Sequence, residues 1–599
     1  MDRKSILIVA LCVAMLFGWH FVVNKMYPPK PAPPAATNVV SATQTATTTN
    51  LTAPAPSGQS NVAPSTGPAP RLVVDTNTPE QLIVRTNEHA RYTFTSYGGG
   101  LKFVELVDYP ETVSRKHDPA TGRLATLNAQ APTPSLAILD GETLQGDGIF
   151  TLTSSEEGVH AEKQLPNGLV LIKDFVIGTN YLLTVSIRFE NQSTQAVSIP
   201  EQKWIVGTAT PLHSQDNGQR VGWMWYNGNK TAASLGGQFF SSSGFLWMPR
   251  TPPTEFRAGQ NDVGWAAMYN QFFTLAIMPD RPAAQVVARQ VNLPPPSEEE
   301  IQVHPRAIRL PKGYEVSIVY AATNIAPGQE VQHQAHVYAG PKEYQTLAHI
   351  GAQFSNRLDE IMSFGWAGFF SKALLLGMNW LHSALRLSYG WAIIAITVII
   401  KLVFWPLTQA STRSMKRMQS LQPQMKAIAD KYKDDPMKRN QKTMEFMKQN
   451  KVNPVGGCLP MLLQTPVFIG FYFMIGTAIE LRGAHFLWVK DLSQADTLFL
   501  IPGLNFPFNL LPLIMGATML WQAHLTPLSP GMDPMQQKIM RYMPLMFLVI
   551  LYNYSAGLTL YWTVNNLLTI VQTKLTKTTS PPAAPAKAPV LTSPPKKRK

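Results

Sequence analysis

A lysine inside an apolar segment is the residue whose type and position most clearly could do chemistry. Lys401 lies within residues 392–409, a run that is otherwise typical of a membrane-spanning helix. A lysine near the centre of such a helix costs about 2.5–3.5 kcal/mol on insertion scales. The cost is offset either by snorkelling of the side chain to the cytoplasmic interface or by a polar cavity around the ammonium group.

Polar residues near Lys401 and in the other apolar segments favour the cavity. Thr397 and Trp405 lie four residues before and after Lys401, on the same face of a helix. The polar residues in the other segments are Gln464, Gln522, Thr559, Thr563, Asn565 and Asn566. Such residues usually face a bundle interior or a watery cavity. The pattern predicts a wet pocket with one positive charge, while hydrogen bonds between helices, worth about 0.6 kcal/mol each, are the alternative.

The composition of the chain excludes several classes of protein. It has 599 residues, a net charge of +14 and two cysteines, Cys12 and Cys458, so a disulfide framework is excluded. There is no zinc-ligand spacing, P-loop or dinucleotide fingerprint, and no cofactor or metal is expected. The positive excess is confined to the extreme N-terminus, residues 409–451 and the tail, which indicates anionic lipid, ribosomal RNA or cytoplasmic orientation rather than DNA binding.

The N-terminal part of the chain is expected to be a membrane anchor followed by a linker. In residues 1–27, Arg3 and Lys4 precede an apolar run, and no good cleavage site follows it. An uncleaved transmembrane anchor is therefore favoured over a cleaved signal peptide or a lipoprotein modified at Cys12. Residues 28–70 are rich in Pro, Ala and Thr and predict a periplasmic linker.

Residues 71–340 are expected to form one β-sandwich domain. Residues 181–190 alternate between apolar and polar side chains, as in a half-buried strand. Further strand candidates are residues 82–85, 92–96, 101–106, 272–277 and 307–310. Many short strands with turns between them favour a sandwich. The aromatic residues at 223–226 and Trp247 fit either core packing or a sugar site. The single acids and histidines form no catalytic pairing; they are His213, Glu255 and His304.

The C-terminal half of the chain predicts membrane helices. Residues 341–387 are expected to form an amphipathic interfacial helix with Trp366 and Trp380 at headgroup level. Residues 388–575 are expected to form a helical core. Its five spans are about 389–407, 459–479, 508–525, 540–554 and 557–571. The last two are short against the roughly 20 residues that a bilayer core requires, which predicts a locally thinned bilayer.

The distribution of basic residues predicts the orientation. Residues 409–458 and the tail 576–599 are strongly basic, whereas residues 482–507 carry only Arg482 and Lys490 as basic residues. Cytoplasmic loops carry an excess of Lys and Arg. Six spans, counting the anchor, then place both termini in the cytoplasm and the β domain in the periplasm of a bacterium with two membranes.

The basic segment 409–451 is expected to be a cytoplasmic helical hairpin. Its turn is predicted at residues 433–436, and Pro423 should kink or shorten the first helix. Methionine stripes run along both helices, with members Met415, Met418, Met425, Met444 and Met447. Such stripes suit adaptable binding of varied apolar segments, and a hairpin packed on itself is the alternative. The basic tail predicts RNA or lipid binding, or a topological signal alone.

Four stretches carry a resemblance to a known family. They are TVIIKLVFWPLT (397–408), NPVGGCLPMLLQTPVFIGFY (453–472), DPMQQKIMRYMP (533–544) and SAGLTLYWTVNNLLTIVQ (555–572). The chain resembles the YidC/Oxa/Alb family of membrane protein insertases, specifically its six-span Gram-negative YidC type. The resemblance covers the order of the spans, the hairpin and the outer domain.

The resemblance implies a fold and a mechanism. The fold is a polytopic α-helical membrane protein of the bacterial inner membrane, with an N-terminal anchor, a five-helix insertase core and a periplasmic β-supersandwich similar to sugar mutarotases. The function is insertion and folding of membrane proteins, with or without the Sec translocon, and is not enzymatic. A hydrophilic groove open to cytoplasm and lipid is implied; its residues are Lys401, Thr397, Gln464, Tyr561, Trp562 and Asn565. Substrate slides along Phe468, Phe471, Met543 and Phe547.

The implied partners follow from the same resemblance. They are nascent membrane proteins, the Sec translocon with its accessory subunits, ribosomes or targeting factors at the hairpin and tail, and anionic lipids. Two positions depart from the family, which usually has arginine at position 401 and often a Tyr-Tyr pair at Tyr561-Trp562. Lysine is a point charge that cannot fork onto a carboxylate, and tryptophan lacks the hydroxyl.

Two other functions remain open at this point. The first is a transporter or channel for an anionic solute, although the halves of the chain show no internal repeat of the kind transporters often have. The second is a membrane-tethered carbohydrate-binding protein or enzyme acting through the β domain. A glycoside hydrolase would need two carboxylates at a defined separation, and the sequence shows no such pair.

Overall fold

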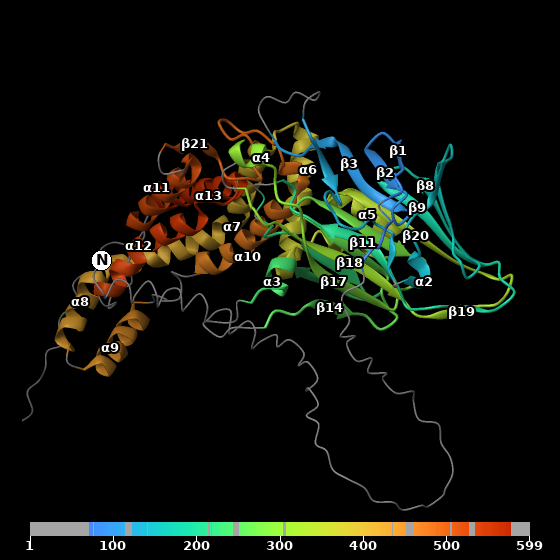
Figure 1. Cartoon of the computed structure of the whole chain (residues 1–599). Coiled ribbons are helices and arrows are strands. Elements are labelled where there is room, and N and C mark those ends of the chain that lie inside the picture. Colours follow the sequence, from blue (N-terminus) through green and yellow to red (C-terminus); the bar gives the residue numbers. More distant parts are fainter. Residues whose placement is uncertain are drawn as a thin grey trace, which may run out of the picture. The chain divides into compact units, whose positions relative to one another are not determined.

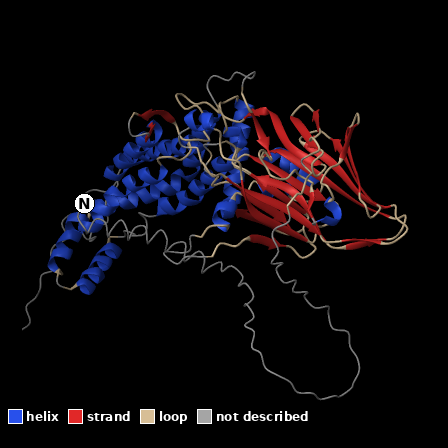
Figure 2. Cartoon of the chain, viewed as in Figure 1, coloured by secondary structure: helices blue, strands red, loops and turns tan. Residues whose placement is uncertain are grey.

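The computed structural model describes residues 71–576 apart from short gaps. The gaps are residues 76, 114–121, 140–141, 214–215, 217, 243–250, 304–306, 434, 451–458, 503–505 and 526–533. The features expected on the sequence that lie outside the described residues are the anchor 1–27, the linker 28–70, nearly all of the tail, Cys458, Trp247 and His304. Within the described residues, strands and helices gather in separate parts of the chain (Figure 2).

The strand part contains two large antiparallel sheets (Figure 1). The nine-stranded sheet has the order β13 (Thr231–Leu235), β12 (Gly222–Tyr226), β15 (Trp265–Tyr269), β16 (Phe273–Pro279), β20 (Glu330–Pro341), β9 (Leu182–Asn191), β8 (Leu169–Ile177), β7 (Gly158–Gln164) and β6 (Thr151–Ser154). The five-stranded sheet has the order β14 (Glu255–Ala258), β17 (Gln285–Asn292), β18 (Lys312–Tyr320), β11 (Gln202–Ala209) and β5 (Ile138–Leu139).

Smaller elements complete the strand part. A four-stranded sheet has the order β1 (Leu82–Thr86), β2 (Ala90–Thr95), β3 (Gly100–Pro110) and β4 (Leu124–Leu127). The remaining elements are the pair β10 (Val197–Ile199) and β19 (Thr323–Ile325), and the short helices α2 (Glu142–Gln145), α3 (Gly236–Phe239) and α4 (Glu298–Val303). These elements extend the strand part beyond the two large sheets.

The alternation predicted at residues 181–190 is confirmed in β9. Buried and half-buried positions alternate along the whole strand, and Leu183, Val185 and Ile187 are fully buried. The strand expected at 307–310 is wrong, because these residues form a loop before β18 and Leu310 is 82% exposed. Pro311 follows directly and offers no N–H to a strand partner, so the apolar run cannot extend as a ladder.

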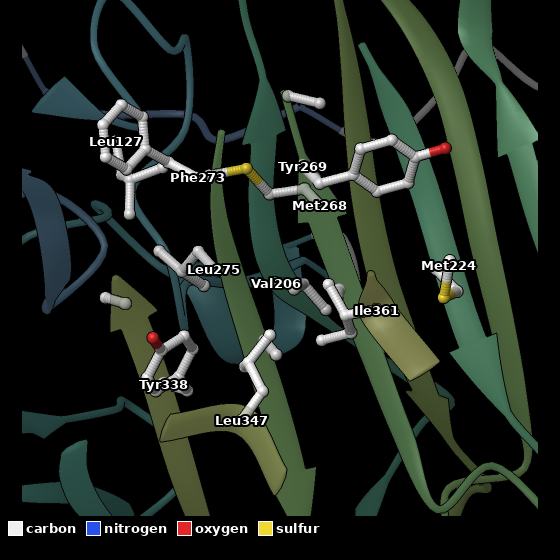
Figure 3. Close-up of a cluster of buried hydrophobic side chains, with 14 of the residues drawn as sticks. Leu127, Val206, Met224, Met268, Tyr269, Phe273, Leu275, Tyr338, Leu347 and Ile361 are labelled. Atoms are coloured by element: carbon white, nitrogen blue, oxygen red, sulfur yellow. The ribbon is translucent and has the colours of Figure 1, made fainter. Parts of the chain in front are cut away.

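The core of the strand part is apolar and aromatic. Met268, Phe273 and Leu275 lie on neighbouring strands, with Leu347 of α5 (Tyr344–Gln353) close by (Figure 3). Trp223, which was a candidate for lining a sugar site, is fully buried and surrounded by aromatic rings of the same core. The aromatic cluster around Trp223 is therefore core packing.

The segment 341–387 is less regular than expected. The expected amphipathic helix is present as α6 (Gly368–Leu385). The apolar residues at helical spacing before it form α5 and then the 3-10 turns η1 (Leu358–Ile361) and η2 (Gly365–Ala367). The break occurs at Arg357, whose φ of 52° is left-handed. Trp366 and Trp380 are 73% and 61% exposed, as an interfacial position requires.

The helical part follows, and its elements are α7 (Tyr389–Ser420), α8 (Gln422–Lys431), α9 (Pro436–Gln449), α10 (Leu459–Thr477), α11 (Leu510–Leu525), α12 (Pro534–Leu551) and α13 (Ala556–Leu575). Among the described residues, α7 is the one helix both long and apolar enough to cross a membrane, with a mean hydropathy of 2.0. It continues through Pro406 into the basic segment and ends at Ser420.

The last two helices are longer than the sequence indicated. Helix α12 has 18 residues and begins at Pro534, and α13 has 20 residues and runs to Leu575. Both extend into polar residues because Gln, Lys, Met and Leu are good helix formers whatever their polarity. The apolar part of α12 is limited to Arg541–Leu551, which is short against the roughly 20 apolar residues of a span, so local thinning of the bilayer stays a prediction.

Arginines connect the strand part to the helical part. Arg220, in the loop before β12, donates a hydrogen bond to the carbonyl of Gly476 near the C-terminus of α10. In the other direction, Arg482, just after α10, donates to the carbonyls of Pro110 at 2.6 Å and Glu111 at 3.0 Å. Each contact places a guanidinium group on backbone oxygens of the other part.

One lysine is fully buried in the strand part. The Nζ atom of Lys173 in β8 donates to the backbone carbonyls of Gly98 and Leu136, both at 2.8 Å, and lies 4.6 Å from the centre of the Phe150 ring. Burial disfavours the ammonium form and lowers the pKa of Lys173 to about 7. Two hydrogen-bond donors are still available on a neutral amine.

We predict that Lys173 makes the free energy of unfolding rise with pH. Between about pH 7 and its ordinary pKa of about 10.4, the unfolded chain binds a proton at this lysine that the folded chain lacks. The stability gained over this window amounts to about 5 kcal/mol at most. Calorimetric unfolding of the protein in detergent across this range should show the rise, and Lys173→Met should abolish it.

The matched control is Lys312→Met, because Lys312 is an exposed lysine at the start of β18. This variant should keep the pH profile of the wild-type protein. An identical profile for Lys173→Met and the wild-type protein would contradict the prediction.

Candidate functional site

Lys401 lies on the seam between α7 and α13. Its half-buried side chain donates from Nζ to the hydroxyl of Thr569 at 2.9 Å. The Thr569 hydroxyl in turn donates to the carbonyl of Asn565, one helical turn earlier, at 2.7 Å. The ammonium group therefore meets a neutral oxygen rather than a carboxylate, and a hydroxyl satisfies one of its three donors.

Thr569 is not among the residues predicted for the site, although its spacing from a predicted residue indicates it. Thr569 follows the selected residue Asn565 by four positions and so lies on the same helical face. Thr397, predicted beside Lys401, is buried, and its hydroxyl donates to the carbonyl of Ile393 at 2.6 Å within its own helix. Thr397 thus shares the face of Lys401 but offers its hydroxyl proton to its own backbone.

Gln464, Tyr561 and Phe471 meet between α10 and α13. The Gln464 side-chain amide donates to the Tyr561 hydroxyl. Tyr561 is buried, and its ring stacks on that of Phe471 with 4.0 Å between the ring centres. Phe471 is fully buried, so its predicted place on an outer sliding face is wrong. Val467 and Met474, four before and three after it, are also buried and place Phe471 on the inward stripe of α10.

A second aromatic group lies between α10, α12 and α13. The Trp562 ring packs edge-on against Phe468 with 4.5 Å between ring centres and lies 5.7 Å from the ring of Phe547. All three side chains are half-buried, as is that of Met543, one turn before Phe547. Neighbouring residues of a helix point about 100° apart, which is why Tyr561 lies inside and Trp562 lies at this more open position.

The other polar residues of the bundle form hydrogen bonds either between helices or within one helix. Asn566 donates to the Thr518 hydroxyl on α11 at 3.3 Å, and Gln572 donates to the Thr408 hydroxyl on α7 at 2.6 Å. Thr559 and Thr563 donate to carbonyls within α13. For Asn566 the alternative of a hydrogen bond between helices is correct, whereas Thr559 and Thr563 bond within their own helix.

The methionine stripes of the hairpin pack mainly on each other. Met418, Met425 and Met447 are buried in one cluster with Leu421 and Phe446. Three of the five predicted recruitment methionines are therefore core residues of the hairpin, which corrects that prediction. Met415 is half-buried and Met444 is 46% exposed.

The helical break in the hairpin falls where proline permits it. Helix α7 ends at Ser420, and Pro423 lies in the first turn of α8, where its missing N–H has no helical partner to lose. This confirms that Pro423 shortens the first helix. The Asp435 carboxylate accepts from the amide of Lys438 at 3.0 Å and caps α9.

Glutamates on the five-stranded sheet line a hollow of its face but are paired with arginines. Glu315 accepts from Arg289 at 2.6 Å, and Glu255 accepts from Arg257 at 3.1 Å. Each of the two carboxylates is thus bound by a neighbouring guanidinium group. In the described residues, no group of three or more His, Cys, Asp or Glu side chains is arranged to hold a metal ion.

Two family models match the chain. The model described as the 60Kd inner membrane protein matches residues 380–583, and the model of the YidC periplasmic domain matches residues 83–376. The first covers the helical part, including Lys401 and Thr569, and the second covers nearly all of the strand part. The chain is thus a helical membrane protein joined to a β-rich periplasmic domain.

Curated relatives match almost the full length. The membrane protein insertase YidC of Syntrophus aciditrophicus is 30% identical over 589 residues, covering 96% of this chain and 98% of the relative. That of Geobacter metallireducens is 31% identical over 594 residues, covering 96% and 97%. The chain therefore belongs to the YidC family of membrane protein insertases.

Solved structures give more distant likenesses. A crystal structure of an active YidC insertase with its first transmembrane domain resolved is 18% identical and has a TM-score of 0.34, covering 84% of this chain and 94% of that chain. A putative aldose 1-epimerase from Escherichia coli K12 is 12% identical with a TM-score of 0.26, covering 44% and 99%.

Family membership settles the general function and location. The protein is a membrane protein insertase of the bacterial inner membrane with a periplasmic domain, and its substrates are nascent membrane proteins. The family is not enzymatic.

We predict that Phe471→Ala lowers the stability of the helical bundle. The substitution removes a fully buried ring stacked on Tyr561, and such truncations cost about 3 kcal/mol or more. The melting temperature in detergent should fall clearly, whereas Leu545→Ala, at a position that is 41% exposed on α12, should change it little. Equal melting temperatures for the two variants would mean that Phe471 lies on an outer face of the bundle.

Proposed function

We propose that α7 and α10–α13 enclose a hydrophilic groove, open to the cytoplasm and to lipid, through which the polar end of an incoming protein passes. The observation that carries the proposal is the contact of Lys401 with the neutral hydroxyl of Thr569. A cation in a membrane bundle without a carboxylate beside it attracts an acidic or polar substrate segment. Asn565 and Thr569 line the same side of α13 and supply further polar contacts.

The apolar part of the substrate travels along a different surface. Trp562, Phe468, Phe547 and Met543 form a half-buried apolar surface across α10, α12 and α13. A substrate helix packed there leaves the groove sideways into lipid. Its own burial drives the step, at about 25 cal/mol for each Å² of apolar surface removed from water. No nucleotide or metal is required for this partition.

The proposed topology has six spans with both termini in the cytoplasm. The domains follow the limits predicted on the sequence: anchor 1–27, linker 28–70, β domain 71–340, interfacial region 341–387, and insertase core 388–575 with the hairpin 409–451 and the tail 576–599. The contact of Arg220 with the C-terminal end of α10 supports this arrangement, because it puts that end on the periplasmic side with the β domain.

Partners beyond the substrate bind at the two ends of the bundle. The hairpin α8–α9 presents basic side chains and the exposed Met437 and Met444 to ribosomes or targeting factors. Its buried methionines stabilise this surface from inside. The Sec translocon binds at α6 and the edges of the β domain, and anionic lipids bind the basic tail. Lys401 would equally suit an anion transporter, but the insertase family membership favours protein insertion.

We predict that Lys401→Glu blocks insertion of substrates with acidic tails. A negative charge at this position repels the tail and should slow insertion at least about tenfold, a barrier change of ~1.4 kcal/mol. Growth of a depletion strain rescued by each variant and protease protection of a substrate with an acidic tail measure the effect. Full insertion of that substrate by Lys401→Glu would rule the mechanism out.

One matched variant and one matched substrate separate the effect of charge from damage to the structure. Lys401→Arg keeps the cation and should restore both growth and insertion. A substrate whose tail is uncharged should be slowed less by Lys401→Glu than the acidic one. A loss that is equal for both substrates would indicate damage to the fold.

We predict that water reaches the seam between α7 and α13. In a chain freed of Cys12 and Cys458, Asn565→Cys should react with a membrane-impermeant maleimide added to inverted membrane vesicles, because an ionised thiol requires a hydrated site. Val403→Cys is the control: Val403 is 67% exposed on α7, yet its face meets lipid in the proposed arrangement. Labelling at 403 with none at 565 would show that no groove exists.

A further inference from the structure

The connection between α10 and α11 contains a small apolar hairpin. Strands β21 (Thr497–Ile501) and β22 (Phe506–Asn509) pair antiparallel and form a two-stranded sheet. Its exposed side chains are Leu498, Phe499, Leu500 and Phe506, which are 40–54% exposed. Residues 497–525 contain no Asp, Glu, Lys or Arg. An exposed apolar group of this kind usually marks an interaction site.

Both faces of this hairpin are apolar. Successive residues of a regularly paired strand point to opposite faces, so Phe499 and Leu500 lie on opposite faces, while the register shifts at Leu498. Phe499 stacks on Phe508 of the partner strand with 5.0 Å between the ring centres. A single flat protein surface would cover one face, whereas a layer of lipid surrounds both.

The base of the hairpin is held rigidly by polar contacts. Asp496 accepts from the amide of Leu511 in the first turn of α11 at 2.6 Å and from the Trp488 indole at 3.1 Å. Asn509 accepts from the Thr497 hydroxyl at 2.7 Å and donates to the carbonyl of Tyr552, after α12, at 2.8 Å. The exposed apolar side chains are therefore presented in a fixed position beside the ends of three membrane helices.

The position of the hairpin identifies its surroundings. It follows α10, whose C-terminal carbonyl at Gly476 contacts Arg220 of the periplasmic domain. It therefore lies on the periplasmic side, at the level where α10 ends and α11 begins. The Tyr552 ring lies beside Phe506, with 5.2 Å between the ring centres. It continues the apolar surface to the residue that follows α12.

We propose that the β21–β22 hairpin inserts both of its faces into the interfacial region of the outer leaflet and contacts lipid there. The unpaired backbone groups at the edges of a two-stranded sheet need water or headgroups, which excludes the hydrocarbon core and sets the depth at the interface. The hairpin then fixes the outer ends of α10, α11 and α12 relative to the bilayer. This inference goes beyond the proposed groove and depends only on α10 and α11 spanning the membrane.

Fluorescence quenching by labelled lipid tests this proposal. In the full chain with Cys12→Ser and Cys458→Ser, single cysteines at Phe499 and at Leu500 are labelled with an environment-sensitive dye. The protein is placed in phosphatidylethanolamine and phosphatidylglycerol vesicles that contain lipids with a nitroxide high on the acyl chain. Both positions should show blue-shifted emission and a several-fold greater loss of fluorescence than the control, Val84→Cys on β1, which is 48% exposed.

Three results would overturn the proposal. The first is water-like emission without quenching at both positions. The second is quenching at only one of the two faces, and the third is a blue shift that requires an added protein partner such as a Sec subunit, because in both cases a protein would cover the hairpin. The measurement is independent of Lys401. Full insertion by Lys401→Glu together with full quenching at 499 and 500 would overturn the groove and leave this inference standing, whereas blocked insertion without quenching would do the reverse.

Discussion

The hydrogen bond from the Lys401 ammonium group to the Thr569 hydroxyl is the interaction on which the proposed function of the helical bundle depends. A lysine within a membrane helix costs about 2.5–3.5 kcal/mol. One hydrogen bond between membrane helices returns about 0.6 kcal/mol on average and less than about 2 kcal/mol at best. The hydroxyl alone cannot offset the cost. Water or a polar ligand must therefore supply the remainder, which is what a hydrated groove provides and a dry helix seam does not.

Lys401 differs in this respect from the other polar residues of the bundle. Gln464 bonds to Tyr561, Asn566 bonds to Thr518, and Gln572 bonds to Thr408. These three contacts join α13 to α10, α11 and α7 in turn, and make α13 the common partner of its neighbours. Neutral amide and hydroxyl groups suit this role because they can be satisfied without solvent. The ammonium group of Lys401 keeps two donors beyond its bond to Thr569, and this supports the proposal that Lys401 is a functional residue.

The sequence predicted those features that depend on local periodicity. The alternation in β9 is fixed by its own residues, since one face of the strand must be buried whatever lies opposite. The place of Phe471 could not be found in this way, because α10 is apolar all round and its period does not show which side meets α13. The methionine stripes were found correctly, but whether a stripe is covered depends on the pairing of α8 with α9, which is a tertiary contact.

The outer end of the bundle is closed by groups that come from outside the helices. Arg220 of the β domain caps a carbonyl of α10, Asp496 caps the first turn of α11, and the carbonyls of Leu492 and Gln494 accept from the amides that open α13. Unpaired backbone groups at helix ends are costly away from water. Satisfying them at this end with protein atoms removes the need for solvent there. This closure supports the proposal that the groove is open at the opposite, cytoplasmic end only, and that a substrate enters partway rather than passing through.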